Sequence, residues 1–304
     1  MTTDPHAATS LVEPALSEAA GLIVRTLETL LPRAEGPEAP MIAAMRKVAL
    51  EKADRLRGFL VLQSGRLFGV DRRALARVAA AVECLHASAL IRDDLKALGG
   101  GGRGAALQDE FGDAAPILAG DALMVFAFGL LAAPDAHGDP FVRCELVARL
   151  SEVAGHGGLL GGQMMNVVLA DAPPVLHEVT RLQRMKTAGL VAYCCEAGAI
   201  LGKTSHSTRA ALAAFGQELG ATLQITEDLQ TYAADAGAST PDATNSVVQN
   251  AKRGKLGLVA AMGAERAHAQ GRAMAGQAAR HLDLFDEKAD LLRAVCAFAV
   301  ARPV

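Results

Sequence analysis

Apolar residues recur at intervals of three and four along most of the chain, with Ala, Leu, Arg and Glu dominating. This is the period of an α-helix with one buried face, and the alternating β-branched runs of strands are missing. The pattern predicts an all-α bundle of roughly ten helices with mostly short connections. We expect Asp71 to cap the helix that carries ALARVAAAVECLHASAL, and Ser207 or Thr208 to cap the helix that carries Glu227.

The longest apolar run, residues 122–133, is bounded by Asp121 and Pro134. It is too short to span a bilayer and predicts a buried helix. The first ten residues lack the basic start and long apolar core of a signal peptide. We therefore expect a cytoplasmic protein with no integral membrane segment. Gly, Pro, Ser, Thr and Asn cluster at residues 236–247, which predicts a mobile loop.

Composition adds limits to this picture. A chain of 304 residues, 51% hydrophobic, can bury a large core, and no linker interrupts it, so we predict a single domain over residues 1–304. A net charge of -3 gives no basis for a nucleic-acid surface. The cysteines are odd in number and lack metal-ligand spacing, and each lies in an apolar run. We expect buried, reduced thiols at all five: Cys84, Cys144, Cys194, Cys195 and Cys296.

Candidate chemistry gathers in residues 86–121. An apolar helix ends there in the adjacent carboxylates Asp93 and Asp94, and four glycines follow at residues 99–102. Two adjacent acids repel each other unless a cation lies between them, and Mg²⁺ with a diphosphate as its companion would suit them. Taken alone, the pair is better explained as a solvated helix end with basic neighbours.

The pair has a counterpart on a second apolar helix, residues 217–235, which carries Glu227 and Asp228. Two acidic pairs on two helices suggest a cavity with metal on both walls. The segments AAAVECLHASALIRDDL, ILAGDAL, GGQ, KT and LQITED occur in the order and approximate spacing found in the trans-isoprenyl diphosphate synthases. Over nearly its whole length the chain resembles this polyprenyl synthetase family, which includes the farnesyl and geranylgeranyl diphosphate synthases.

The resemblance implies an isoprenoid-synthase-type helical bundle around a central cavity. It implies a prenyltransferase that uses Mg²⁺ to condense isopentenyl diphosphate with an allylic prenyl diphosphate, and a helical homodimer. The implied catalytic residues are Asp93, Asp94, Lys186, Glu227 and Asp228, of which the four acids bind the metal. The implied substrate-binding residues are Arg57, His86, Arg103, Gln163, Lys186, Thr187, Gln224 and Lys255.

Several of these residues have ordinary explanations when the resemblance is set aside. His86 is then a histidine satisfied inside a helix bundle, and Lys186 and Lys255 are surface cations. The segment HGGLLGGQ, residues 156–163, follows no strand and lacks the GK[ST] ending of a phosphate-binding loop. It predicts close helix packing or a helix break.

The residues before the first acidic pair imply the chain length of the prenyl product. In the family, bulky side chains at the fourth and fifth positions before the pair close the floor of the pocket. Here these positions hold Ala89 and Ser88. The small side chains imply a deep pocket and a product of about twenty carbons or more.

The chain also departs from the family's motifs. Glycines stand at residues 99–102, where further aspartates are expected, and Thr231 ends the second motif in place of an aspartate. The family's GKxxRP segment, which holds isopentenyl diphosphate, reads ADRLRG at residues 53–58, so that its lysine has become Asp54. Losing a carboxylate ligand weakens a hard-cation site, so we expect impaired Mg²⁺ binding and reduced activity.

Two other functions stay open. A catalytically silent or regulatory paralogue that forms a heterodimer with an active synthase would also lose its acids, although the retained cations favour the enzyme. Glu227, Thr231 and Asp235, at i, i+4 and i+8, resemble the metal-binding triad of class I terpene cyclases, which ionise a prenyl diphosphate without a second substrate. Cyclases line their cavities with aromatic rings, and this chain has no Trp and two Tyr.

Overall fold

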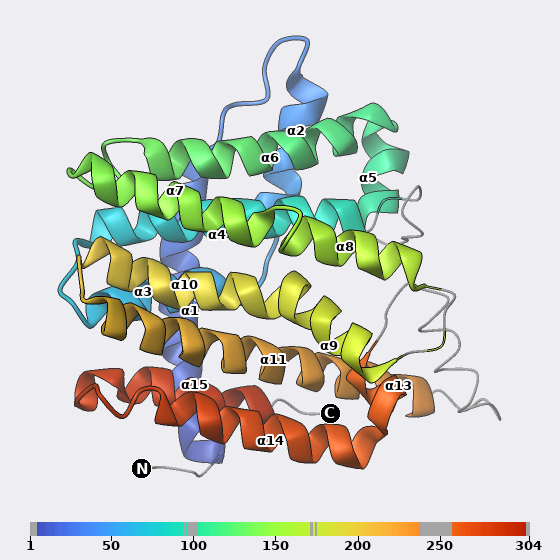
Figure 1. Cartoon of the computed structure of the whole chain (residues 1–304). Helices are drawn as coiled ribbons and strands as arrows, with labels where there is room; N and C mark the ends of the chain where they lie inside the picture. The colour runs from blue at the N-terminus through green and yellow to red at the C-terminus, as the bar shows by residue number, and fades with distance from the viewer. Residues whose placement is uncertain are drawn as a thin grey trace. The chain divides into compact units, whose positions relative to one another are not determined.

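The computed structural model describes residues 5–93, 95, 103–170, 173, 175–237 and 257–301 (Figure 1). Throughout this part of the chain the regular structure is helical, without a strand, which confirms the all-α prediction. Fourteen α-helices are described, more than the ten predicted, because short turns divide several of the apolar runs. The α-helices are α1 (Pro5–Leu30), α2 (Ala39–Ala49), α3 (Leu56–Arg66), α4 (Arg72–Asp93), α5 (Arg103–Phe111), α6 (Ala114–Ala132), α7 (Pro140–Ala154), α8 (Leu159–Val168), α9 (Leu176–Gln183), α10 (Gly189–Leu201), α11 (His206–Gly237), α13 (Leu258–Met262), α14 (Ala264–Arg280) and α15 (Asp290–Ala301), joined by the π-helical turn η2 (Arg184–Ala188) and the 3₁₀ turn η3 (Glu287–Ala289).

The chain divides into two compact units, and each is described by itself. Unit 1 comprises Met1–Pro14, Glu152–Glu196 and Ser205–Val304, and unit 2 comprises Ala15–Ser151 and Ala197–Thr204. The single domain over residues 1–304 stays a prediction.

Helix α4 is the centre of unit 2, where it packs against α2, α3, α5 and α6 (Figure 1). Its Ala, Val and Leu side chains are buried on almost every face, which a helix surrounded by others requires. Asp71 caps its first turn as predicted: Oδ2 accepts the backbone N–H groups of Arg73 at 2.9 Å and Ala74 at 3.0 Å.

The apolar run at residues 122–133 belongs to α6, and the prediction that this helix is buried is wrong for one of its faces. Leu123 and Ala127 are fully buried, whereas Leu118 is 52% and Val125 67% exposed. A run that is apolar on every side gives no sign of which face a neighbour covers. Only the packing partners, α4 chief among them, decide it.

Three described helices are long and apolar enough to cross a membrane by length and composition: residues 6–30, 72–93 and 114–132. The apolar character of α4 has another explanation, because 78% of its most apolar window is buried in the protein. The third span also exceeds the run read from the sequence, because α6 begins at Ala114. A cytoplasmic protein without an integral membrane segment stays a prediction.

In unit 1 the long helix α11 packs against α13, α14, α15 and η2. Its cap is Ser205, whose Oγ accepts the N–H of Thr208 at 3.2 Å, so the predicted caps Ser207 and Thr208 are wrong. Neighbouring hydroxyls all suit a cap by composition, and the backbone selects one. Gly220 brings α11 against η2, since a Cβ there would lie 2.7 Å from the Cα of Ala188. Of the predicted loop at residues 236–247, residues 238–247 lie outside the described part of the chain.

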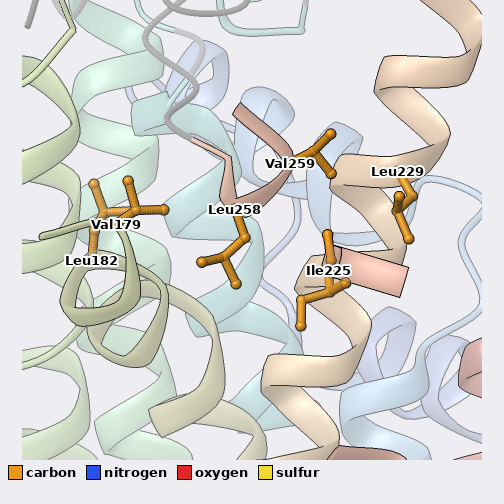
Figure 2. Packing of buried hydrophobic residues seen from close by; sticks show 7 residues of the cluster. Val179, Leu182, Ile225, Leu229, Leu258 and Val259 are labelled. Atoms are coloured by element: carbon orange, nitrogen blue, oxygen red, sulfur yellow. The ribbon is translucent and has the colours of Figure 1, made fainter. Parts of the chain in front are cut away.

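A hydrophobic cluster joins α9, α11 and α13 in unit 1 (Figure 2). Helix α13 has five residues, and a helix this short is not stable without such packing. The cluster therefore fixes the first residues of α13 beside the second acidic motif on α11. Its labelled members are Val179 and Leu182 from α9, Ile225 and Leu229 from α11, and Leu258 and Val259 from α13.

The cysteine prediction is confirmed at four positions and wrong at Cys144, which is exposed on α7. On that helix Val142, Leu146 and Leu150 recur every fourth residue and are buried. Cys144 lies on the opposite face, together with Phe141, which is 82% exposed. Helical phase, which an apolar neighbourhood does not reveal, decides the exposure of this thiol.

Candidate active site

A pocket of about 60 Å³ in unit 2 lies between the segment before α3 and the middle of α4. Arg57 and His86, two of the predicted substrate-binding residues, line it, and Arg57 Nη1 is 3.1 Å from His86 Nε2. Because arginine has only donors, Nε2 must accept this hydrogen bond, which requires its lone pair. The structure therefore brings the predicted cation and histidine together, with the imidazole in a tautomer whose proton is on Nδ1.

Beneath this pair lies a buried ion pair that the sequence analysis did not identify. Arg55 Nη1 is 3.2 Å from Glu83 Oε2, and both side chains are at most 4% exposed. Arg55 Nη2 donates to the carbonyls of Ala49 at 2.8 Å and Glu51 at 2.6 Å. Glu83 Oε1 accepts the N–H of Gly58 at 2.8 Å. We call these contacts the Arg55–Glu83 clamp.

The clamp explains how the segment before α3 is held. Arg55 has φ 55° and ψ 35°, a left-handed conformation that a residue with a side chain adopts at some cost. The buried ion pair and the backbone hydrogen bonds hold it there. The clamp thereby fixes the start of α3, and Arg57 lies in the first turn of this helix. One sign was present in the sequence: Glu83 is a single acid inside a long apolar run.

The first acidic motif is described at one of its two acids. Asp93 is the last residue of α4 and is half-buried, while Asp94 lies outside the described residues. Arg92 Nη1 is 3.7 Å from Asp121 Oδ1, and burial lowers the pKa of the Arg92 guanidinium. The side chain of Arg103 also lies outside the described residues.

The two residues predicted to set pocket depth are buried on α4. Ala89 is 5% exposed. Ser88 is fully buried, and its hydroxyl donates to the carbonyl of Gly120 on α6 at 2.6 Å. Ser88 therefore contributes to the contact between α4 and α6. Ala89 has no polar group that needs a hydrogen-bond partner.

The second acidic motif, in unit 1, contains a carboxylate enclosed by donors. Asp228 Oδ2 accepts from Gln183 Nε2 and from the N–H of Leu258, both at 2.9 Å, and Oδ1 accepts from Gln224 Nε2 at 3.1 Å. Burial raises the pKa of Asp228 to about 6 in spite of these donors. The carboxylate thus joins α9, α11 and the start of α13. Gln183 was not identified from the sequence.

Predicted site residues Lys186 and Thr187 lie in the π-helical turn η2. Such turns are rare and frequent at functional sites. Thr187 Oγ1 donates to Gln224 Oε1 at 2.7 Å, which connects η2 to the hydrogen bonds of Asp228. The structure therefore links three predicted residues in one network. Lys255 lies outside the described residues.

The GGQ segment on α8 packs against this turn. A Cβ at Gly162 would lie 2.9 Å from the backbone nitrogen of Lys186 and 3.0 Å from its Cβ. Glycine is therefore needed for α8 and η2 to approach this closely, which agrees with close helix packing as the explanation of HGGLLGGQ. Gln163, the next residue, is 6% exposed.

The remaining residues of the second motif differ from Asp228. Glu227 is exposed. Thr231 Oγ1 donates to the backbone carbonyl of Glu227 at 2.9 Å, so its hydroxyl proton is used within its own helix. The side chain of Asp235, the third member of the cyclase-like triad, lies outside the described residues.

The described acids of the two motifs fit one of the usual ways in which proteins bind Mg²⁺. Within the described part of the chain, no three His, Cys, Asp or Glu side chains gather into a metal cluster. Among the described acids of the two motifs, Asp93 in unit 2 is half-buried and Glu227 in unit 1 is exposed. Mg²⁺ is commonly held by one or two carboxylates together with substrate phosphates and water. Single carboxylates such as Asp93 and Glu227, as far as the structure describes their surroundings, fit that arrangement.

Comparison with known proteins agrees with these features. The crystal structure of an FPP/GFPP synthase from Zymomonas mobilis in its apo form superposes with a TM-score of 0.83 at 35% identity, covering 96% of this chain and 99% of that chain. The fold is that of the isoprenoid synthases. A model of the polyprenyl synthetase family matches residues 39–293. The chain belongs to the polyprenyl synthetase family.

Individual relatives have similar lengths. Farnesyl diphosphate synthase of Escherichia coli (strain K12) is 31% identical over 259 residues, which cover 82% of this chain and 84% of that protein. Geranylgeranyl diphosphate synthase of Pantoea ananas is 33% identical over 236 residues, covering 75% and 77%. The chain is thus similar over most of its length to prenyltransferases of the polyprenyl diphosphate synthase type, in a family that binds prenyl diphosphates and typically uses Mg²⁺.

Proposed function

We propose that the protein condenses isopentenyl diphosphate with an allylic prenyl diphosphate and so elongates a prenyl chain. The observation that carries the proposal is the pocket with Arg57 and His86 in unit 2. An enzyme that only ionises one diphosphate has no need of a second anion pocket, whereas a condensing enzyme must hold two. Arg57 supplies a fixed cation, and His86 accepts its hydrogen bond and orients it.

The residues of unit 1 would act on the allylic substrate. Lys186 neutralises charge on the departing diphosphate, and the network through Thr187, Gln224 and Asp228 holds its turn in place. Mg²⁺, when bound, would supply a Lewis acid that stabilises the charge on the leaving diphosphate. The carboxylates proposed to bind Mg²⁺ are Asp93 and Asp94 in unit 2 and Glu227 in unit 1. Apolar walls must exclude water, because an allylic cation exposed to water is hydrolysed instead of condensed.

We further propose that the protein binds Mg²⁺ more weakly than relatives with complete aspartate motifs. Glycines at residues 99–102 and Thr231 supply no carboxylate. Asp228 is already satisfied by three protein donors, which a metal ion would have to displace. Fewer available carboxylates predict activity that needs a higher Mg²⁺ concentration.

A deep product pocket and dimerisation are the finer parts of the proposal. The small side chain of Ala89 supports a product of about twenty carbons or more, by analogy with the family. The exposed apolar face of α6, with Leu118 and Val125, supports a homodimer or a heterodimer with an active synthase, because such a face is usually covered by a partner.

The test is a product assay with Mg²⁺ and farnesyl diphosphate, with and without isopentenyl diphosphate, analysed by mass spectrometry and by diphosphate release. Elongated product only in the presence of isopentenyl diphosphate is the expected result. Diphosphate release without isopentenyl diphosphate would instead support cyclase-like ionisation. No reaction with this or shorter allylic substrates would favour a silent paralogue, which co-purification with an active synthase would then identify.

Single substitutions test the metal ligands. Asp93→Ala and Glu227→Ala should each abolish Mg²⁺-dependent turnover. Unchanged turnover in both variants would remove the case for a metal site at these residues.

A further inference from the structure

The pocket that contains Arg57 and His86 holds few cations for a diphosphate. Three carboxylates and three cationic side chains line it, so its ionised groups cancel when His86 is neutral. A diphosphate carries at least two negative charges and needs more than one cation to replace its water. Which of the three cations are available therefore decides whether the pocket can bind one.

Arg55 is not available. Its residue is 5% exposed, and its guanidinium is held by Glu83 and by two backbone carbonyls in the Arg55–Glu83 clamp. Removing this internally neutral pair from the count leaves two carboxylates, Glu51 and Asp54, and two cations, Lys52 and Arg57. Arg57 alone does not balance a diphosphate.

Lys52 is the remaining cation, and its backbone is fixed on both sides. The carbonyl of Glu51, its neighbour, accepts from Arg55 Nη2. On the other side, Asp54 Oδ1 accepts the N–H of Leu56 at 3.1 Å at the start of α3. Lys52 lines the pocket between these two anchors, and its side chain is exposed. The ammonium is therefore hydrated before a ligand binds, and the long side chain can bring it to the ligand.

We propose that Lys52 is a binding residue for the diphosphate of the homoallylic substrate and supplies the positive charge that Asp54 does not. The assignment deepens the proposed condensation and rests on it. Asp54 acts in the opposite direction: its carboxylate lines the same pocket and repels the diphosphate, so this pocket binds its ligand more weakly than one with a lysine at position 54.

Direct binding tests this assignment without turnover. Isopentenyl diphosphate cannot condense when no allylic substrate is present, so its Kd can be measured at equilibrium by calorimetry. Lys52→Gln should weaken binding about tenfold, the loss of one charge-assisted hydrogen bond. Lys52→Gln/Asp54→Lys moves the lysine by two positions and also removes the repelling carboxylate, so its affinity should at least equal that of the protein without substitutions. Lys288→Gln removes another exposed lysine, in unit 1, and should leave the affinity unchanged.

Turnover separates a substrate contact from a general defect. Lys52→Gln should raise KM for isopentenyl diphosphate about tenfold while kcat and KM for the allylic substrate stay within twofold. A folded Lys52→Gln protein whose Kd changes less than twofold would overturn the assignment. The assignment would also be overturned if the protein without substitutions did not bind isopentenyl diphosphate. Binding that depends on Lys52 but yields no elongated product would keep the assignment and overturn the proposed function.

Discussion

The Arg55–Glu83 clamp should be one of the most costly places to alter this protein. Arg55→Met would leave the buried charge of Glu83 without its partner and two carbonyls without their donor. Breaking a buried pair in this way costs about 3–5 kcal/mol. Glu83→Gln keeps an acceptor for the N–H of Gly58 but leaves the Arg55 charge buried, and should cost about 3 kcal/mol.

The double variant distinguishes charge from shape. Arg55→Met/Glu83→Gln leaves no uncompensated buried charge, so it should cost no more than Arg55→Met alone. The double-mutant cycle should then give a coupling of about 2 kcal/mol or more. Urea denaturation followed by circular dichroism provides the free energies of unfolding, and equal m-values would show that the variants unfold alike.

An exposed ion pair of nearly the same length serves as the control. Arg72 Nη2 is 3.1 Å from Glu18 Oε1, with side chains 60% and 59% exposed. Because water screens such a pair, Arg72→Met and Glu18→Gln should each change stability by at most about 1 kcal/mol. Arg55 and Glu83 variants that cost no more than these controls would contradict a buried, desolvated ion pair.

Three further perturbations test other parts of the structure. Since burial raises the pKa of Asp228 from 3.8 to about 6, its contribution to stability is present in full below pH 3.8 and is lost as the pH rises through 6. The stability advantage of the protein over Asp228→Asn, measured by urea denaturation in EDTA, should therefore shrink between these values, and a constant difference would contradict the raised pKa. Gly162→Ala should raise KM for the allylic substrate and destabilise the protein by about 1–3 kcal/mol, because its Cβ would lie 2.9 Å from the nitrogen of Lys186. Gly129→Ala, with nothing within 4 Å, should stabilise α6 by up to about 1 kcal/mol, and equal effects of the two glycine substitutions would argue against the close contact. Ala89→Phe should shorten the products seen by mass spectrometry, and unchanged products would exclude this position as the pocket floor.

Several residues of the candidate site could be selected from the sequence because motifs are local patterns. The motif segments located His86, Arg57, Thr187 and Gln224, and the structure then placed Arg57 with His86 and Thr187 with Gln224. A capping aspartate also acts within one turn of its own helix, which is why Asp71 was predicted correctly.

Contacts between distant segments were not predictable in the same way. Arg55 and Glu83 lie 28 residues apart, and Gln183 and Asp228 lie 45 apart, so no local pattern relates them. Asp228 read as a metal ligand by its position in a motif, while its three hydrogen bonds depend on where α9 and α13 pack. Burial likewise depends on neighbours, as the exposed Cys144 on α7 demonstrates.

The sequence by itself determined the helical class, the family and the residues that bear charge, because these depend on periodicity and on local motifs. Tertiary structure alone decided which charges remain available to a ligand. The sequence identifies Arg55 and Asp228 as charged residues but does not reveal their partners, and packing encloses each with fixed ones. A charge already satisfied by buried partners would have to exchange them for a ligand, whereas an exposed one such as that of Lys52 exchanges only water.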